Sequence, residues 1–222
     1  MFGNLCSTVK TISLGILCFP GNQVYSQTWD GVGTLYKISS GGSLFNQLII
    51  APNGNYYVSF YDSGLQKGSV KKYDGTSWSD VGGVSGVGAQ YGNYSSLSGD
   101  AQGNLYFTNK NSASLEVRKF DGSEWSQLPN AETTNIFAQS SAVSPTSNIP
   151  YVFSGASSGS VKKFSNGTWT NVGATGFTGS TNTSSPKIII NNGQIYVSHN
   201  GSGLKVHTIA ENAAPTDAWT LL

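Results

Sequence analysis

Few residues of this 222-residue chain could perform chemistry, and they are scattered along it. Gly155–Gly159 matches the pattern G-x-S-x-G, which marks a serine nucleophile only at a strand-to-helix elbow; here it joins two short apolar runs. The two histidines, His199 and His207, stand eight residues apart without nearby carboxylates, which makes a poor zinc site. We therefore predict no catalytic set, no metal and no cofactor.

Charged residues make up 10% of the chain, and the formal net charge is +1. The single arginine, Arg118, cannot supply the arginine cluster that binds the carboxylate of a sialidase substrate. No basic face large enough for a phosphate backbone is predicted, so nucleic acid is excluded as a partner. Three basic pairs are interpreted as strand side chains whose charge stays in water, with an anion-binding column as the alternative. The pairs are Lys71-Lys72, Arg118-Lys119 and Lys162-Lys163.

Five tryptophans, 44–50 residues apart, define the repeats that must position these residues. They are Trp29, Trp78, Trp125, Trp169 and Trp219. Two further sets keep nearly the same spacing: Tyr57, Tyr106, Tyr151 and Tyr196, and Val70, Val117, Val161 and Val206. Because the three sets recur with nearly the same spacing, they indicate tandem repeats at about 34–80, 81–127, 128–171 and 172–222.

Each repeat can be divided into four short strands. In the second repeat we expect strands at 94–98, 105–108, 115–120 and 125–128, with Asp121-Gly122 as a tight hairpin turn. Four strands in about 45 residues are typical of a β-propeller blade, whereas a β-sandwich is the alternative. We predict an all-β β-propeller over 28–222, built from four four-stranded antiparallel repeats. Five blades, or an open array that closes by self-association, are the other interpretations.

Three motifs resemble those of secreted bacterial β-propeller repeat proteins. They are W-x-x-V-G at Trp78–Gly82, G-N-x-Y-V at Gly54–Val58, and V-K-K-Y-D-G-x-x-W at Val70–Trp78. The repeat length and its central tryptophan are also similar to tachylectin-type sugar-binding propellers. This resemblance covers Trp29 to Leu222 and implies the architecture. It implies less about function, because the residues that carry it build the blades.

The N-terminal segment 1–27 is interpreted as a secretory signal peptide, with a buried strand as the alternative. Lys10 precedes a short apolar run, Thr11–Phe19, that is too short to span a membrane. Both cysteines, Cys6 and Cys18, lie in this segment, so the mature chain would lack disulfides. We expect a secreted, periplasmic or extracellular protein without a membrane span.

The loops that differ between repeats are expected to carry any ligand site. Aromatic rings can stack on sugar rings, while amides and carboxylates bond sugar hydroxyls. The candidate ligand-binding residues are Tyr61, Asp62, Tyr91, Tyr94, Asn109, Phe137, Phe177, His199 and Asn200. The repeated tryptophans and tyrosines are instead expected to pack between blades.

These observations favour a non-enzymatic propeller that binds carbohydrate or another surface ligand on its loop face. A protein-interaction or adhesion scaffold that binds a cell-surface protein is the second hypothesis. A hydrolase is the third, because propellers host many functions; its site would then involve Asp62 and His199.

Overall fold

The computed structural model describes residues 37–88, 93–133, 136, 138–181 and 183–222. The expected signal peptide, Trp29, Tyr91 and Phe137 lie outside the described residues. Sixteen strands and two short 3₁₀ helices, Val81–Gly83 and Ala156–Ser158, make up the regular structure there. In the part of the chain that is described, no helix has the length and apolarity needed to cross a membrane.

The strands form four antiparallel sheets of four strands each, in which consecutive strands are neighbours. The first sheet contains β1 (Ser43–Ile50), β2 (Tyr56–Asp62), β3 (Lys67–Tyr73) and β4 (Trp78–Asp80). The second contains β5 (Asn93–Gly99), β6 (Leu105–Asn111), β7 (Ser114–Phe120) and β8 (Trp125–Gln127). The third contains β9 (Gln139–Val143), β10 (Pro150–Ser154), β11 (Ser160–Ser165) and β12 (Thr168–Asn171). The fourth contains β13 (Ser184–Asn191), β14 (Gln194–Gly201), β15 (Gly203–Ala210) and β16 (Thr220–Leu221).

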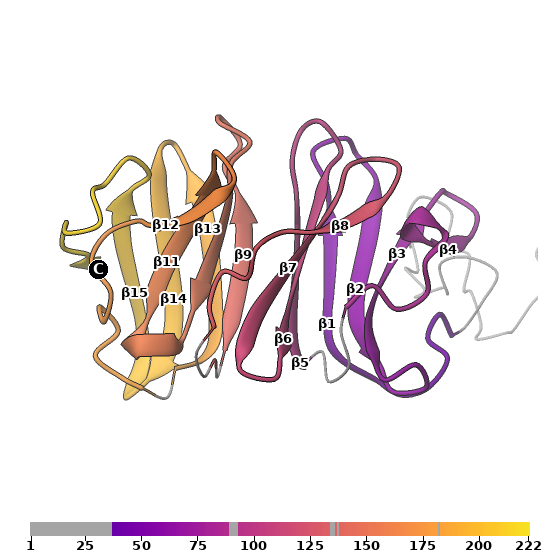
Figure 1. The fold of residues 1–222 in the computed structure, drawn as a ribbon, viewed down its shortest axis with the longest axis horizontal. Coiled ribbons are helices and arrows are strands. Elements are labelled where there is room, and N and C mark those ends of the chain that lie inside the picture. The colour runs from indigo at the N-terminus through magenta and orange to yellow at the C-terminus, as the bar shows by residue number, and fades with distance from the viewer. Residues whose placement is uncertain (1–36, 89–92, 134–135, 137, 182) are drawn as a thin grey trace, which may run out of the picture. The chain divides into compact units, whose positions relative to one another are not determined.

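These sheets confirm the predicted all-β fold of four four-stranded antiparallel repeats. They follow one another in sequence order, and their first strands pack side by side, β1 on β5, β5 on β9, and β9 on β13 (Figure 1). No comparable packing joins β13 back to β1 among the described residues. The first and fourth sheets therefore stand at the two ends of the series.

The tight turns between the third and fourth strands form as the sequence predicts. Asp74 and Asp121 each accept backbone N–H bonds from the second and third residues that follow, at 2.7–2.9 Å. Gly75 and Gly122 adopt φ angles of 98° and 102°, which glycine accepts without strain. These hydrogen bonds lower the pKa of Asp121 to about 2. The two aspartates thus shape the turns.

Each sheet has two faces, and strand register assigns residues to them. We call the face that carries Leu97 and Phe107 in the second sheet the front face, since it packs on the first sheet. The opposite face, which carries Tyr106 and Val117, is the back face, and Val117 packs toward the third sheet. The repeated tyrosines and valines of the first three sheets are buried on their back faces, as the sequence predicted for residues between blades. They are Tyr57, Tyr106, Tyr151, Val70, Val117 and Val161.

Polar contacts join each first strand to the next at one repeated back-face position. Gln47 bonds the backbone of Leu97 through both amide atoms, at 2.9 and 3.1 Å. The equivalent Ser96 accepts the backbone N–H of Ser141 at 3.0 Å. Ser140, the next equivalent, accepts from Ile188 N–H at 3.3 Å. The sheets are thus joined by one recurring arrangement.

The tryptophans fasten the outer strands. Each of Trp78, Trp125 and Trp169 lies against an aromatic ring of the third strand, with centroids 5.0–5.4 Å apart. The indole N–H of Trp125 donates to the Val81 carbonyl of the preceding sheet at 3.0 Å. The indole N–H of Trp169 does the same to Pro129 at 2.7 Å. Trp219 differs, because its indole nitrogen is buried without a partner.

Candidate functional site

One front-face position of the third strand carries a basic or imidazole side chain in every sheet. The strand register makes Lys71, Arg118, Lys162 and His207 equivalent. The last three face an interface with the preceding sheet. The side chains that contact these three residues differ from one interface to the next. The candidate site is the interface at which no such side chain of the described residues fills the space.

Between the second and third sheets, the basic side chain is neutralised by the chain itself. Lys162 Nζ lies 3.1 Å from a Glu132 carboxylate oxygen and donates to the Ala131 carbonyl at 2.8 Å. The other oxygen of Glu132 accepts from the Ser160 hydroxyl at 2.8 Å. Both residues contributed by the preceding loop, Ala131 and Glu132, therefore occupy the contacts that a ligand would use.

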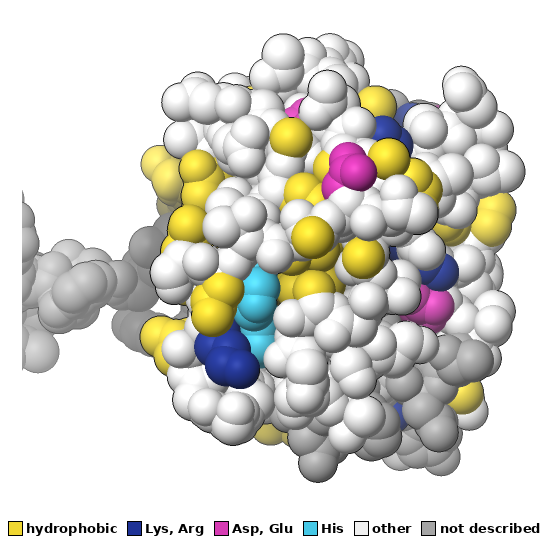
Figure 2. Space-filling model, turned by 90° about the vertical axis from the view of Figure 1, so that its left-hand side faces the viewer, with side chains coloured by type: hydrophobic (Ala, Val, Ile, Leu, Met, Phe, Trp, Pro, Cys, Tyr) yellow, Lys and Arg dark blue, Asp and Glu magenta, His cyan; other side chains and the backbone are white. Residues whose placement is uncertain are grey.

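Between the third and fourth sheets, an aromatic side chain covers the equivalent place. Phe177 stacks on Trp219, with ring centroids 4.2 Å apart, and meets His207 edge-on at 5.3 Å. His199 Nε2 and His207 Nδ1 are 3.3 Å apart, and both rings are buried. In Figure 2 the histidines (cyan) are visible between hydrophobic side chains and a basic side chain. The aromatic ring of Phe177 thus takes the position beside the tryptophan.

The environment of the two histidines favours their neutral forms. Burial lowers the pKa of His199 below its usual 6.5, and His207 and Lys205 lower it further. Burial and the Lys205 charge likewise lower the pKa of His207. No group of three or more His, Cys, Asp or Glu side chains is placed to hold a metal ion among the described residues. The two rings stack with centroids 5.2 Å apart, with His199 Nε2 and His207 Nδ1 within hydrogen-bond distance.

Between the first and second sheets, the interface opens into a cleft of about 550 Å³. One wall is the loop after β4, and the other is formed by β7, β8 and the turn that joins them. The lining residues are Lys67, Gly82, Val84, Gly86, Val87, Gly88, Arg118, Ser123, Glu124 and Trp125. Among the described residues of this loop, 81–88, neither an aromatic ring nor a carboxylate fills the cleft, in contrast to the other two interfaces.

Several residues of the loop wall are glycines, which add no side chains to the cleft. A β-carbon on Gly82 would lie 3.0 Å from Phe120 and 3.3 Å from Trp125, and the residue has a φ of +68°. A β-carbon on Gly88 would meet Phe107 and Asn109 at 3.0–3.2 Å. Side chains at these two positions would push into the wall formed by the second sheet. Glycine at these two positions thus lets the loop backbone lie close to the second sheet without adding side chains to the cleft.

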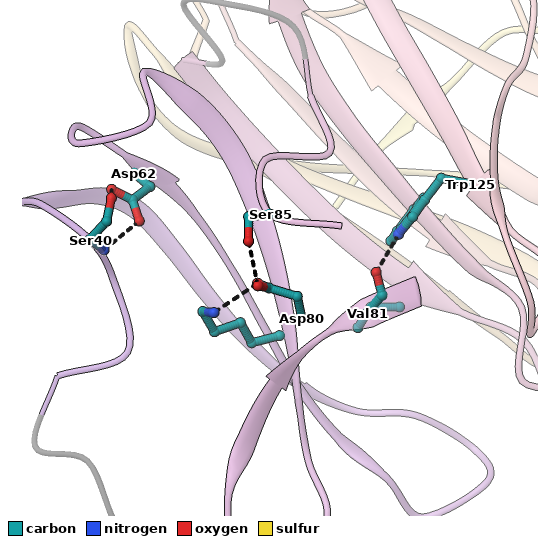
Figure 3. Close-up of polar contacts among 7 residues, drawn as sticks. Ser40, Asp62, Asp80, Val81, Ser85 and Trp125 are labelled. Carbon is teal, nitrogen blue, oxygen red and sulfur yellow. Dashed lines mark hydrogen bonds and ion pairs between the residues drawn. The ribbon is translucent and has the colours of Figure 1, made fainter. Parts of the chain in front are cut away.

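Hydrogen bonds hold the described part of this loop, 81–88, at both of its ends. Asp80, just before the loop, accepts from Lys71 Nζ at 2.7 Å and from the Ser85 hydroxyl at 2.6 Å (Figure 3). The Trp125–Val81 bond fixes the first residue of the loop, and Gly88 N–H donates to the Gly68 carbonyl at 3.1 Å. The loop backbone is therefore preorganised.

The Asp80 carboxylate stays ionised through these contacts. Burial alone would raise the pKa of Asp80. The hydrogen bonds from Lys71 and Ser85, together with the charge of Lys71, outweigh that effect and lower the pKa below its usual value. The anchor of the loop therefore holds at neutral pH.

The opposite wall offers donors, an acceptor and an aromatic ring. Arg118 Nε donates to Glu116 at 2.6 Å, and its Nη2 lies 3.5 Å from the Gln127 amide oxygen. These contacts use two of the five N–H donors of a guanidinium group. Trp125 is half-buried, and Glu124 is exposed at the turn. The wall thus combines hydrogen-bonding groups with an apolar surface.

The predicted ligand residues Tyr61 and Asp62 lie at the end of β2 and are not among the residues that line this cleft, although Asp62 pairs with the lining residue Lys67. Asp62 is buried and accepts bonds from the Ser40 and Gly41 backbones, the Ser40 hydroxyl and the Gly64 backbone at 2.7–3.0 Å (Figure 3). Burial would raise its pKa, but these bonds outweigh it and lower the pKa. The carboxylate therefore fastens residues 40–41 and 64 to the sheet.

The structure does not gather the other predicted residues into one site. Asn109 is buried beside Gly88 at the first interface, and its Oδ1 has no partner. Phe177 and His199 each pack on His207 at the third interface, whereas Tyr94 is exposed and packs on Phe45 with centroids 4.9 Å apart. Asn200 is exposed near the end of β14.

Sequence reasoning missed the residues that line the cleft. The sequence predicts Arg118 as a strand residue whose charge stays in water, with an anion-binding column as the alternative, and favours packing between blades over ligand stacking for Trp125. A usable signal is present in residues 81–88 of the loop after β4, VGGVSGVG, where glycine recurs and no side chain is larger than valine. The equivalent loops contain Glu132 and Phe177, the side chains that fill the other two interfaces.

Comparisons with known proteins support the fold. No protein-family model matches the sequence, and no curated protein matches it. Among solved structures, SapL1 lectin in complex with α-methyl fucoside superimposes with a TM-score of 0.56 and 9% identity, over 81% of this chain and 63% of that chain. An Aleuria aurantia lectin mutant in complex with Fucα1-6GlcNAc gives 0.52 and 17%, over 80% and 62%. A Hadza microbial sialidase gives 0.54 and 13%, over 83% and 47%.

The chain thus spans less than two thirds of the length of each of these three proteins. Another structure of the Aleuria aurantia lectin is described as a six-bladed β-propeller. At identities of 9–17%, the likeness establishes the fold and leaves the activity to be argued from this chain's own residues. By its fold, the chain is a β-propeller protein.

Proposed function

We propose that the protein is a non-enzymatic lectin that binds a neutral carbohydrate in the cleft between the first and second sheets. The observation that carries this proposal is the open, glycine-walled cleft beside Arg118 and Trp125. At the equivalent interfaces, Glu132 and Phe177 fill the same place. The ligand side of the molecule is then an interface between sheets and not the tips of the loops.

The chemistry of the cleft suits a neutral sugar. Lys67 and Arg118 carry two positive charges, and Glu116 and Glu124 carry two negative charges, so the formal charges balance. An indole ring can cover the apolar side of a pyranose, and the charged groups can bond its hydroxyls. Two structural neighbours are lectins bound to fucosides, which supports the proposal by analogy of fold.

A glycan array with the full chain identifies the sugar, and titration of the strongest hit tests the site. Arg118→Lys keeps the charge beside Glu116 but loses the planar fork of donors. We expect about tenfold weaker binding or more, the cost of one charge-assisted hydrogen bond. Lys119→Arg, at the neighbouring residue on the opposite face, is the matched control and leaves the affinity unchanged.

Three results would argue against the proposal. They are the absence of binding to any glycan, equal affinities for Arg118→Lys and the wild type, and release of free sugar from a bound glycan. The last result would instead support the hydrolase hypothesis. Equal melting temperatures for both variants would exclude a folding defect as the cause of weaker binding.

Export is part of the same proposal. Segment 1–27 has the pattern of a signal peptide, and a lectin must reach an exposed glycan. The mass of the protein recovered outside the producing cell checks this. We expect an N-terminus near Gln27, whereas a full-length chain retained in the cytoplasm would contradict export.

A further inference from the structure

All three interfaces between sheets use the same two surfaces. A front face meets the back face of the preceding sheet, and equivalent positions are buried each time. On front faces, Leu97 is 1% exposed and Leu105 is 0% exposed. On back faces, Tyr57 and Val70 are buried in the same way. The same front-to-back packing of sheets thus occurs three times along the chain.

The front face of the first sheet is partly exposed among the described residues: Phe60 is buried there, but the apolar side chains at its other end are not. Register makes Leu48 equivalent to Leu97, and Tyr56 equivalent to Leu105. Leu48 is 66% exposed and Tyr56 is 47% exposed, and Ile50 beside them is 64% exposed. A surface that is core in the second sheet therefore faces solvent in the first.

The back face of the fourth sheet is also exposed, although the back faces of the other three sheets are buried. Tyr196 and Val206, the equivalents of the buried Tyr57 and Val70, are only half-buried. Ile189 is 60% exposed and Leu204 is 79% exposed on this face.

We propose that these two faces bind each other between copies of the chain, head to tail. Front-to-back packing of this kind already occurs at three interfaces within the chain. An exposed front face and an exposed back face should therefore be complementary. Within one copy the two faces stand at opposite ends of the series, and β13 does not pack on β1. The front face of one copy therefore meets the back face of another.

The polar contacts fit the same arrangement. Lys187 stands where Gln47, Ser96 and Ser140 join one first strand to the next. Gln47 donates to the Leu97 carbonyl, and the ammonium group of Lys187 offers the same kind of donor to the partner copy. A head-to-tail contact leaves one free face at each end, so it closes a ring of copies or extends a filament.

Sedimentation of the full chain over a range of concentrations tests this proposal. We expect species larger than a monomer that form with increasing concentration. Leu48→Glu places a charge in the exposed front face, and Ile189→Glu places a charge in the exposed back face. Each variant alone should weaken association about tenfold or more, because a buried leucine or isoleucine is replaced by a charge.

Mixing the two variants distinguishes head-to-tail contact from other arrangements. The Leu48→Glu variant keeps an intact back face, and the Ile189→Glu variant keeps an intact front face. The mixture should therefore form one-to-one dimers and nothing larger. Leu65→Glu, at an exposed leucine in the β2–β3 turn, is the control and associates like the wild type.

Three outcomes would overturn the proposal. The first is a wild-type chain that stays monomeric at all concentrations, which would mean that another part of the same chain covers these faces. The second is association that neither variant weakens. The third is association that Leu48→Glu abolishes while Ile189→Glu leaves it intact, which would indicate a front-to-front contact.

Discussion

At the residue scale, one register position determines where a ligand can enter. Arg118, Lys162 and His207 occupy that position at the three interfaces. Glu132 neutralises Lys162, and Phe177 covers His207, so only the arginine faces an open cleft among the described interfaces. Whether a site forms therefore depends more on the loop side chain that contacts each residue than on the residue itself.

The histidine pair makes the stability of the protein depend on pH. Both histidines have a lowered pKa in the folded state, so the unfolded chain takes up protons more readily below pH 6.5. We expect the melting temperature to hold above pH 6.5 and to fall between pH 6.5 and 5, by about 2–4 °C for each kcal/mol lost. The lowered pKa values of Asp62 and Asp80 affect stability only near and below the ordinary value of 3.8, outside this window.

His199→Phe is the variant that isolates this effect. Phe60 stands at the equivalent position in the first sheet, so the fold accepts phenylalanine there. Thermal unfolding from pH 8 to 5 should show a flatter profile for this variant than for the wild type. Identical profiles would mean that the pair does not control the acid sensitivity.

At the element scale, the loops between sheets differ in function because they differ in what they insert. The sequence predicted the strands of the second repeat to within three residues at each boundary, because hydrophobic periodicity and the Asp-Gly turn fix them locally. It did not predict that Phe177 stacks on Trp219 or that Glu132 pairs with Lys162. Those contacts join residues 30–42 positions apart, and their partners follow only from the packing of whole sheets.

The glycine loop gives a direct test of how the cleft wall is held. Gly82→Ala places a β-carbon against Phe120 and Trp125, whereas Gly83→Ala, with the same φ of +68°, meets nothing within 4 Å. Both variants bear the backbone cost of a positive φ, of order 1–2 kcal/mol. We expect Gly82→Ala to lose more stability and to weaken sugar binding, and Gly83→Ala to lose stability alone.

Denaturant unfolding and sugar titration of the two glycine variants measure this difference. Equal stabilities would mean that the β-carbon at Gly82 is accommodated without cost. Unchanged sugar affinity in Gly82→Ala would mean that the loop wall does not contact the ligand.

At the scale of the whole molecule, the repeat positions were predictable and the joining of the ends was not. The tryptophan spacing predicted four repeats, and the tyrosine and valine positions predicted the packing between sheets. The number of blades in a ring depends on the angle between sheets, which composition and spacing do not encode. The uncovered face at Leu48 and the one at Ile189 appear only when the sheets are placed side by side.

The position of a bound sugar tests the central claim most directly. A crystal structure of the full chain with the neutral glycan selected on the array would locate it. We predict the sugar in the cleft between the first and second sheets, with one face within about 4.5 Å of Trp125 and a hydroxyl bonded to Arg118. A sugar bound instead on the loops near Tyr94 or Asn200, with this cleft empty, would contradict the account.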